Sequence, residues 1–115
     1  MKYLLAIYAD EAEWSELGDE GRQAMYQEYG AVSEDLAQRG MMIDGAELQP
    51  TTAATTVRIR DGRTLVTDGP FAETKEQLGG YFVVECESLD EAIEAAGKLP
   101  TARHGSIEVR PLVER

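Results

Sequence analysis

Two ionisable side chains of this sequence could act together on a substrate as acid and base. Asp68 ends an apolar segment directly before Gly69-Pro70, and His104 is the only histidine in the chain. A carboxylate and an imidazole can exchange a proton with a substrate near neutral pH, as isomerases and lyases require. If the protein is an enzyme, these two residues are the predicted catalytic pair, and their chemistry needs no metal. The structural alternatives are a turn in which Asp68 accepts local backbone hydrogen bonds and a surface position for His104.

Four aromatic residues and one charged loop provide the candidate ligand-binding residues. These candidates are Tyr8, Trp14, Tyr29, Tyr81, Glu73 and Lys75. Trp14 either caps the core or lines a pocket at the edge of a dimer. Glu73, Lys75 and Glu76 form either a solvated charge run or a clamp for a ligand. Gly79-Gly80 either allows a ligand or partner backbone to approach closely or forms a bend or bulge where a strand starts.

Residues 10–20 hold six acidic side chains and no basic one. Carboxylates bind Ca²⁺ and Mg²⁺, but the spacing of an EF-hand loop is absent, so a solvated acidic segment is favoured. Cys86 is the only cysteine, which excludes an intrachain disulfide and a structural zinc site built from cysteines. The sequence contains neither a GxGxxG nor a P-loop motif for nucleotides. We therefore predict no bound metal and no cofactor.

The charge balance restricts the partners of the protein. Its 115 residues include 11 Lys and Arg against 22 Asp and Glu, a formal net charge of −11. An acidic surface repels phosphate groups, which argues against direct binding to nucleic acids or to anionic membranes. The apolar N-terminal segment ends at Asp10 and is too short to span a membrane. Together with the single cysteine, this favours a cytoplasmic protein of one domain, residues 1–115.

Two helices are predicted from the spacing of apolar residues and from capping signals. The first begins near Asp19 or Glu20 and ends before Gly40. Its predicted buried face consists of Met25, Tyr29, Val32 and Leu36. The second begins after Ser88, which forms a capping box with Glu91. Its predicted buried face consists of Leu89, Ala92, Ile93 and Ala96.

Four segments are predicted strands, and a hairpin lies between the second and the third. The strands cover residues 2–9, 41–48, 80–87 and 106–113, and the first and third are apolar on both faces. The hairpin turns at Asp61-Gly62, which suits a type I′ turn. The resulting register pairs Val57 with Val66 and Ile59 with Thr64, and this face is predicted to lie against the core.

Two further features concern the hairpin and the loop that follows it. Phe71 is apolar within a polar loop and is predicted to anchor that loop to the core. The second face of the hairpin carries Arg58, Arg60 and Arg63. These arginines either meet an acidic segment of a partner subunit or form a solvated face that discourages edge pairing.

The order strand, helix, strand, hairpin, strand, helix, strand predicts an α+β fold. Without the hairpin, it is the split βαβ arrangement of a ferredoxin-like fold, with an antiparallel sheet and both helices on one face. The helices leave the second face of the sheet uncovered, although the central strands are apolar on that face too. We therefore predict a homodimer that packs through its sheets.

The segment DGPFAETKEQLGGYFVVE, residues 68–85, resembles the signature of the DGPF proteins within the YCII-related superfamily. The segments KYLLAIYADE, TTVRIRDGRTLVTDGPF and GSIEVRPLVE extend the resemblance over nearly the whole chain. The resemblance implies a bacterial protein with a dimeric ferredoxin-like fold. It also implies an enzyme that uses a histidine of the first helix with an aspartate. Here that helix has no histidine, and Tyr29 lies where it is expected; an unperturbed tyrosine is a poor base at neutral pH.

The predicted function is a homodimer that binds a small molecule, with metal-free acid–base activity of the isomerase or lyase type if it is catalytic. The alternative is a non-catalytic interaction module for a protein regulator. The resemblance implies such a regulator, because genes of this family often lie beside those of extracytoplasmic-function sigma factors. A third hypothesis is a structural dimer without a ligand, which predicts that the chain has no enclosed polar cavity.

Overall fold

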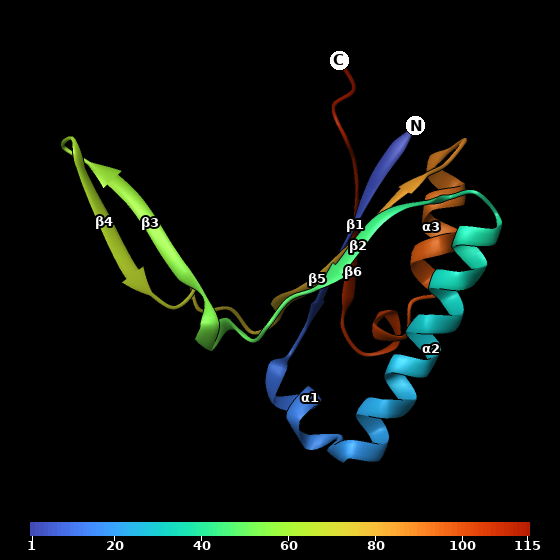
Figure 1. Cartoon of the computed structure of the whole chain (residues 1–115), viewed down its shortest axis with the longest axis horizontal. Helices are drawn as coiled ribbons and strands as arrows, with labels where there is room; N and C mark the ends of the chain where they lie inside the picture. The colour runs from blue at the N-terminus through green and yellow to red at the C-terminus, as the bar shows by residue number, and fades with distance from the viewer.

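The computed structural model describes residues 1–115 and contains two separate antiparallel sheets (Figure 1). The larger sheet has the strand order β2-β5-β1-β6, and the smaller sheet consists of β3 and β4. The elements are β1 Lys2–Ala9, α1 Glu11–Glu16, α2 Gly18–Gln38, β2 Met42–Glu47, η1 Thr51–Ala53, β3 Thr55–Arg60, β4 Arg63–Asp68, β5 Gln77–Glu85, α3 Leu89–Gly97, η2 Pro100–Arg103 and β6 Ser106–Pro111. Helices α2 and α3 lie on the same side of the larger sheet (Figure 1). The predicted ferredoxin-like α+β fold with an inserted hairpin is confirmed.

Strand β1 is the centre of the core, because it pairs with β5 along one edge and with β6 along the other. Tyr3 and Leu5 of β1 lie opposite Val84 and Phe82 of β5, and all four side chains are buried. Successive residues of a strand point to opposite faces, so these four residues define the face that the helices cover. The neighbouring residues of the two strands belong to the open face, on which no helix of the chain packs.

Helix α2 packs its predicted apolar face against this core and ends at the predicted position, before Gly40. Met25 and Leu36 are buried, and Tyr29 and Val32 pack against the core cluster. Gly40 has a φ of 72°, which a glycine adopts without strain. The Met41 N–H donates to the carbonyl of Leu36 at 2.9 Å, and the Gly40 N–H donates to that of Ala37 at 3.0 Å. This pair of bonds is a Schellman motif, which satisfies the last carbonyls of the helix.

The acidic segment after β1 contains a short helix, α1, where the sequence predicted only a polar connection. Asp10 is its N-cap, and Oδ1 of Asp10 accepts a hydrogen bond from the Ala12 N–H at 2.9 Å. Glu11 and Glu13 lie in the first turn, where the helix dipole favours negative charge. Gly18, with a φ of 73°, turns the chain into α2. A helix of six residues has too little apolar periodicity to be detected by spacing.

Helix α3 has the predicted cap, and Ala92 and Ala96 of its predicted face are buried, but the other two residues are not. The Glu91 N–H donates to Oγ of Ser88 at 3.2 Å, which is the N-cap bond of the predicted capping box. Leu89 and Ile93, predicted to be buried, are half exposed, whereas the buried residues are Ala92, Ala95, Ala96 and Leu99. That stripe has the spacing i, i+3, i+4 and i+7 of one helical face. Its alanines are small, so the helix can lie close to the sheet.

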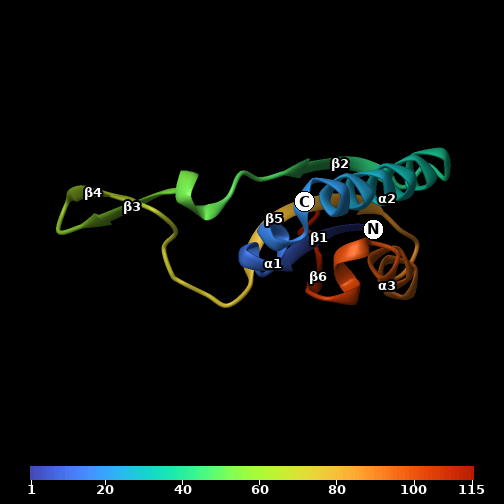
Figure 2. The same ribbon diagram turned by 90° about the horizontal axis from the view of Figure 1, so that it is seen from below.

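The hairpin has the predicted turn and register but not the predicted contact with the core. Asp61 and Gly62 have φ values of 52° and 74°, and Val57 pairs with Val66 as the type I′ turn requires. However, Val57, Ile59 and Val66 are 60%, 65% and 64% exposed, and Figure 2 shows the hairpin extending away from the sheet and helices. The connecting segments before and after the hairpin carry it away from the larger sheet, so β3 and β4 pair only with each other.

The predicted anchoring role of Phe71 is also wrong within the single chain. Phe71 follows the hairpin and is 77% exposed, because the loop from residue 69 to residue 76 runs outside the core. Its carbonyl accepts a hydrogen bond from Nη2 of Arg58 at 3.2 Å. Backbone and side-chain hydrogen bonds, rather than apolar burial, therefore attach this loop to the hairpin.

Candidate functional site

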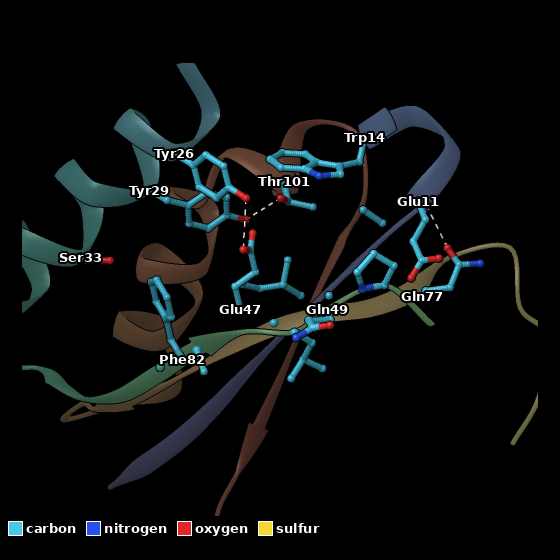
Figure 3. Close-up of a pocket in the computed structure, with 18 of the residues that line it drawn as sticks. Glu11, Trp14, Tyr26, Tyr29, Ser33, Glu47, Gln49, Gln77, Phe82 and Thr101 are labelled. Atoms are coloured by element: carbon cyan, nitrogen blue, oxygen red, sulfur yellow. Dashed lines mark hydrogen bonds between the residues drawn. The ribbon is translucent and has the colours of Figure 1, made fainter. Parts of the chain in front are cut away.

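A cleft of about 540 Å³ lies between helix α2, helix α1 and the helix-covered face of the sheet (Figure 3). Small residues on both walls leave this space open. Gly30 and Ser33 line it from α2, and Gly45, Gly79 and Gly80 line it from the strands. Its volume falls within the range of roughly 300–1,000 Å³ that is typical of small-molecule sites.

Two of the strand glycines of the cleft lie where a Cβ atom would clash with a neighbour. A Cβ atom at Gly45 would lie 2.8 Å from Cδ1 of Phe82, and one at Gly80 would lie 2.9 Å from the carbonyl oxygen of Ala46. The register between β1 and β5 shifts at Ile7, where Gly79 is the additional residue of a β-bulge. Gly79-Gly80 therefore serves as the bulge that the sequence offered as one alternative, and it also forms part of the cleft wall.

Four aromatic side chains contribute much of the apolar lining of the cleft. The rings of Trp14 and Tyr26 meet edge to face with their centroids 5.4 Å apart, and those of Tyr29 and Phe82 do so at 6.2 Å. Figure 3 shows Trp14, Tyr26 and Tyr29 on the side of the helices, and Phe82 rising from the sheet. Edge-to-face pairs fix the orientation of the rings, so the aromatic wall is already in place without a ligand.

The hydroxyl group of Tyr29 forms a short hydrogen bond at the inner end of the cleft. It lies 2.5 Å from Oγ1 of Thr101, and either hydroxyl can donate the proton. Thr101, in the short helix η2, is almost completely buried. Burial raises the pKa of Tyr29 above its ordinary value, although the hydrogen bond with Thr101 acts in the opposite direction. Tyr29 is therefore neutral at physiological pH and serves as a hydrogen-bonding group rather than as a base.

Tyr26 and Glu47 form a second polar pair at the outer end of the cleft. The Tyr26 hydroxyl donates to Oε1 of Glu47 at 3.1 Å, joining α2 to the end of β2. Burial, and then the hydrogen bond to Glu47, raise the pKa of Tyr26. Its proton thus stays on the phenol and the carboxylate of Glu47 accepts the bond.

Glu11 connects the cleft to the base of the hairpin. Its two carboxylate oxygens accept hydrogen bonds from the N–H and the hydroxyl of Thr51, at 2.8 Å and 2.9 Å. The Glu11 N–H donates to Oε1 of Gln77 at 3.0 Å. Helix α1, the short helix η1 and strand β5 are joined through these bonds, so the position of the hairpin base depends on α1.

Comparison with known protein families shows to which proteins this chain is related. The model of the YCII-related domain matches residues 1–115. The chain belongs to the YCII-related domain family. It is also 44% identical over 114 residues to "Uncharacterized protein R00369" of Rhizobium meliloti (strain 1021), which covers 97% of this chain and 92% of that protein. The resemblance detected in the sequence is confirmed.

This YCII-related protein brings only two of the six predicted ligand-binding residues into the cleft. Trp14 and Tyr29 line it. Tyr8 follows Ile7, and Tyr81 precedes Phe82. Ile7 and Phe82 lie on the helix-covered face, so Tyr8 and Tyr81 belong to the open face of the sheet. Glu73 and Lys75 lie in the exposed loop before β5, where Glu73 lines a second, smaller hollow at the base of the hairpin.

The predicted catalytic pair is not assembled within the YCII-related chain. Asp68 ends strand β4 in the small sheet, and His104 is an exposed residue directly after η2. No hydrogen bond links the two side chains, and neither lines the cleft. The turn after Asp68 is held by the backbone, since the Gly69 N–H donates to the carbonyl of Ala54 at 2.7 Å.

Three of the six acidic residues of the segment 10–20 have side-chain partners within the chain. Asp10 caps α1, Glu11 binds Thr51, and Asp19 lies 2.7 Å from Nη2 of Arg22. No group of three or more His, Cys, Asp or Glu side chains is placed to hold a metal ion. The single cysteine, Cys86, is buried in the core, and burial raises the pKa of its thiol. In addition, no helix of the chain is both long enough and apolar enough to cross a membrane.

Sequence reasoning missed four residues that shape the cleft, namely Tyr26, Glu47, Phe82 and Thr101. Tyr26 could have been found, because it precedes Tyr29 by three residues on a predicted helix and therefore lies beside it. Phe82 could have been assigned to the buried face of its strand, because alternation along the strand places it on the same face as Val84. Glu47 and Thr101 have no such signal, since each enters the cleft from the end of an element.

Proposed function

We propose that this YCII-related protein binds a small organic molecule in the cleft between α2 and the sheet. The observation that carries the proposal is the combination of an open volume of about 540 Å³ with an aromatic wall and a few placed polar groups. Binding sites for small molecules typically have this composition, with mainly apolar surface and few hydrogen-bonding groups that orient the ligand. A structural dimer without a ligand would not require such a cleft.

The polar groups suggest how a ligand is oriented. Tyr29 and Thr101 share one hydrogen bond at the inner end, which leaves oxygen lone pairs that can accept from a ligand. The aromatic rings of Trp14 and Tyr26 lie towards α1 and provide stacking surface. Acid–base catalysis by Asp68 and His104 is not part of this proposal, because neither residue lines the cleft.

A binding screen tests the proposal, because Trp14 is the only tryptophan of the chain and it lines the cleft. A panel of small metabolites is screened by thermal shift, and each compound that raises the melting temperature is then titrated against Trp14 fluorescence. A ligand that binds only the folded state raises the melting temperature by mass action. We expect at least one compound that does both. Compounds that stabilise the protein without changing Trp14 emission would place binding elsewhere and refute the proposal.

We also propose that the protein functions as a homodimer that packs through the open face of its sheet. Leu4, Tyr8, Tyr81 and Val83 occupy that face and are only partly buried. No helix of the same chain covers them, whereas the opposite face has two (Figure 1). A second copy would bury these side chains, and a stable interface of this kind buries about 800 Å² of each partner.

The exposed apolar face of the hairpin supports the same assembly. Val57, Ile59 and Val66 are exposed on one face of a ribbon that forms a sheet of its own, separate from the larger sheet. Isolated two-stranded hairpins are marginally stable, so a partner surface would also stabilise the hairpin itself. On the second face, Arg58 donates to the carbonyl of Phe71, and Arg60 donates to that of Ile59.

Sedimentation equilibrium tests the dimer with one substitution on each surface. We expect the unchanged protein to sediment as a dimer, and Val83→Glu or Ile59→Glu to weaken association. Ile93→Glu is the matched control, since Ile93 is half exposed on α3, away from both surfaces. A monomeric wild-type protein, or three variants that all remain equally dimeric, would refute this assembly.

A further inference from the structure

The cleft has an unbalanced charge that restricts the ligands it can hold. Its lining includes three carboxylates, those of Asp10, Glu11 and Glu47, and no lysine, arginine or histidine. An anionic ligand would therefore meet negative charge and no positive partner. Charge of one sign around a cleft attracts ligands of the other sign and repels those of the same sign.

The two arginines nearest the aromatic wall are already engaged elsewhere. Arg22 binds Asp19 at 2.7 Å and donates to the carbonyls of Trp14 and Ser15 at 3.3 Å and 3.1 Å. Arg103 binds both oxygens of Glu28, at 3.0 Å and 2.9 Å, in a bidentate pair. Each guanidinium is thus matched by a carboxylate, and neither supplies a free positive charge for an anion.

The three carboxylates of the cleft are not equivalent. Both oxygens of Glu11 accept from Thr51, and Asp10 accepts from the first turn of α1. Glu47 uses only Oε1, which accepts from the Tyr26 hydroxyl, while its Oε2 has no hydrogen bond within the chain. Figure 3 shows Glu47 extending from the strand towards the tyrosines of α2. Asp10 also has an oxygen without a hydrogen bond within the chain, but Glu47 is the one that contacts the aromatic wall, through Tyr26, and is therefore the carboxylate placed to accept a charged hydrogen bond from a ligand there.

From this geometry we propose that the ligand is an organic cation, a primary or secondary amine attached to an apolar or aromatic body. This inference rests on the proposed binding function of the cleft and specifies its ligand class. The ammonium group pairs with Glu47 beside the ring of Tyr26, and the apolar body lies against Trp14, Tyr29 and Phe82. Aromatic faces attract cations, and a carboxylate hydrogen bond to an ammonium is stronger than one to a neutral donor.

Three probes of nearly equal size and different charge test the ligand class: 2-phenylethylamine, 2-phenylethanol and phenylacetate. Each is titrated against Trp14 fluorescence at neutral pH and low salt, because screening weakens charge pairing. We expect the amine to bind about tenfold more tightly than the alcohol, a difference of about 1.4 kcal/mol, and phenylacetate to bind most weakly. Added salt should reduce the preference for the amine.

Glu47→Gln separates the role of this carboxylate from that of the overall charge. The variant keeps the size of the side chain, and its amide oxygen can still accept from Tyr26. We expect it to bind the amine and the alcohol within about twofold of each other, which is the loss of most of the charge preference. Glu94→Gln is the matched control, because it removes the same charge from an exposed position of α3 that is remote from the cleft lining.

The outcomes distinguish this inference from the proposed function. Phenylacetate that binds as tightly as the amine, or an unchanged preference in Glu47→Gln, overturns the cation assignment while binding in the cleft stands. The assignment is also overturned if all three probes fail while neutral or anionic compounds of the metabolite panel change Trp14 emission. If no compound of any class changes Trp14 emission, the proposed function fails as well.

Discussion

The hydroxyl of Tyr29 on helix α2 lies 2.5 Å from the hydroxyl of Thr101 on η2, although 72 residues separate them in the chain. The bond joins the two elements at the inner end of the cleft, next to the edge-to-face contact of Tyr29 with Phe82. Thr101 is almost completely buried, so its hydroxyl has little access to water and depends on Tyr29 for a hydrogen bond. The bond therefore both holds the cleft wall in position and contributes to the stability of the folded state.

Removing the Tyr29 hydroxyl should cost more stability than removing that of its neighbour. Tyr29→Phe leaves the Thr101 hydroxyl buried without its partner, which costs about 1–3 kcal/mol of the free energy of unfolding. Tyr26→Phe is the matched control on the same helix, since Tyr26 and Glu47 are both exposed to water. Urea denaturation of both variants measures the difference. Equal losses would show that the Tyr29–Thr101 bond has no special structural role.

The raised pKa of Tyr29 predicts a loss of stability at alkaline pH. The folded state holds the phenol proton more tightly than the unfolded state, in which a tyrosine titrates near its ordinary value of about 10. The contribution is therefore fully present below that pH and is lost as the pH rises through the folded pKa. Urea denaturation at several pH values from neutral to strongly alkaline measures it. Tyr29→Phe should lose part of this dependence and keep the part that Tyr26 contributes, and an identical dependence in both proteins would contradict the assignment.

The bonds between Glu11 and Thr51 should protect the hairpin base from local opening. Glu11→Ala removes the acceptor of the Thr51 N–H, and we expect hydrogen exchange of that amide to become about fivefold faster or more, equivalent to about 1 kcal/mol. Glu13→Ala, on the same short helix, is the control because its side chain makes no hydrogen bond within the chain. Amide exchange followed by NMR gives both values. If the two variants exchange at the same rate, α1 does not hold the hairpin base.

Two glycines that line the cleft should respond to alanine in opposite directions. A Cβ atom at Gly45 would lie 2.8 Å from Cδ1 of Phe82 and 3.1 Å from the carbonyl oxygen of Tyr81, so Gly45→Ala should destabilise the protein by about 1–3 kcal/mol. A Cβ atom at Gly30 meets nothing within 4 Å, and alanine favours a helix, so Gly30→Ala should stabilise the protein by up to about 1 kcal/mol. Thermal and urea denaturation test both, and a destabilised Gly30→Ala variant would show that the wall of α2 is more closely packed than the structure indicates.

The residues that carry local signals were predicted well from the sequence. Asp61-Gly62 determines the turn, and the turn then determines every pair of the hairpin, because a hairpin register follows from its turn type. Gly40 and Ser88 mark helix ends through backbone geometry and capping, which also act within a few residues. The strand order followed from the sequence of elements and the limited number of topologies that two helices and four strands allow.

The residues whose position depends on tertiary contacts were predicted less well. Ile93 and Ala95 fit two helical faces about equally by spacing, and the close approach of α3 to the sheet selects the small residue. Val57 and Phe71 are apolar, but the path of the connecting segments, which no local pattern encodes, places them in water in the single chain. The cleft was found only in part, because Glu47 and Thr101 reach it from elements that are distant in the sequence.

Filling the cleft tests the central claim most directly. Ser33→Phe places a ring in the cleft from α2, and Glu34→Phe adds the same side chain to the next, exposed residue of that helix. Both variants are titrated, by Trp14 fluorescence, with a compound that binds the unchanged protein. We predict that Ser33→Phe loses at least about tenfold in affinity and that Glu34→Phe binds within about twofold of the unchanged protein. Equal affinity in both variants would contradict the claim that the ligand occupies the cleft between α2 and the sheet.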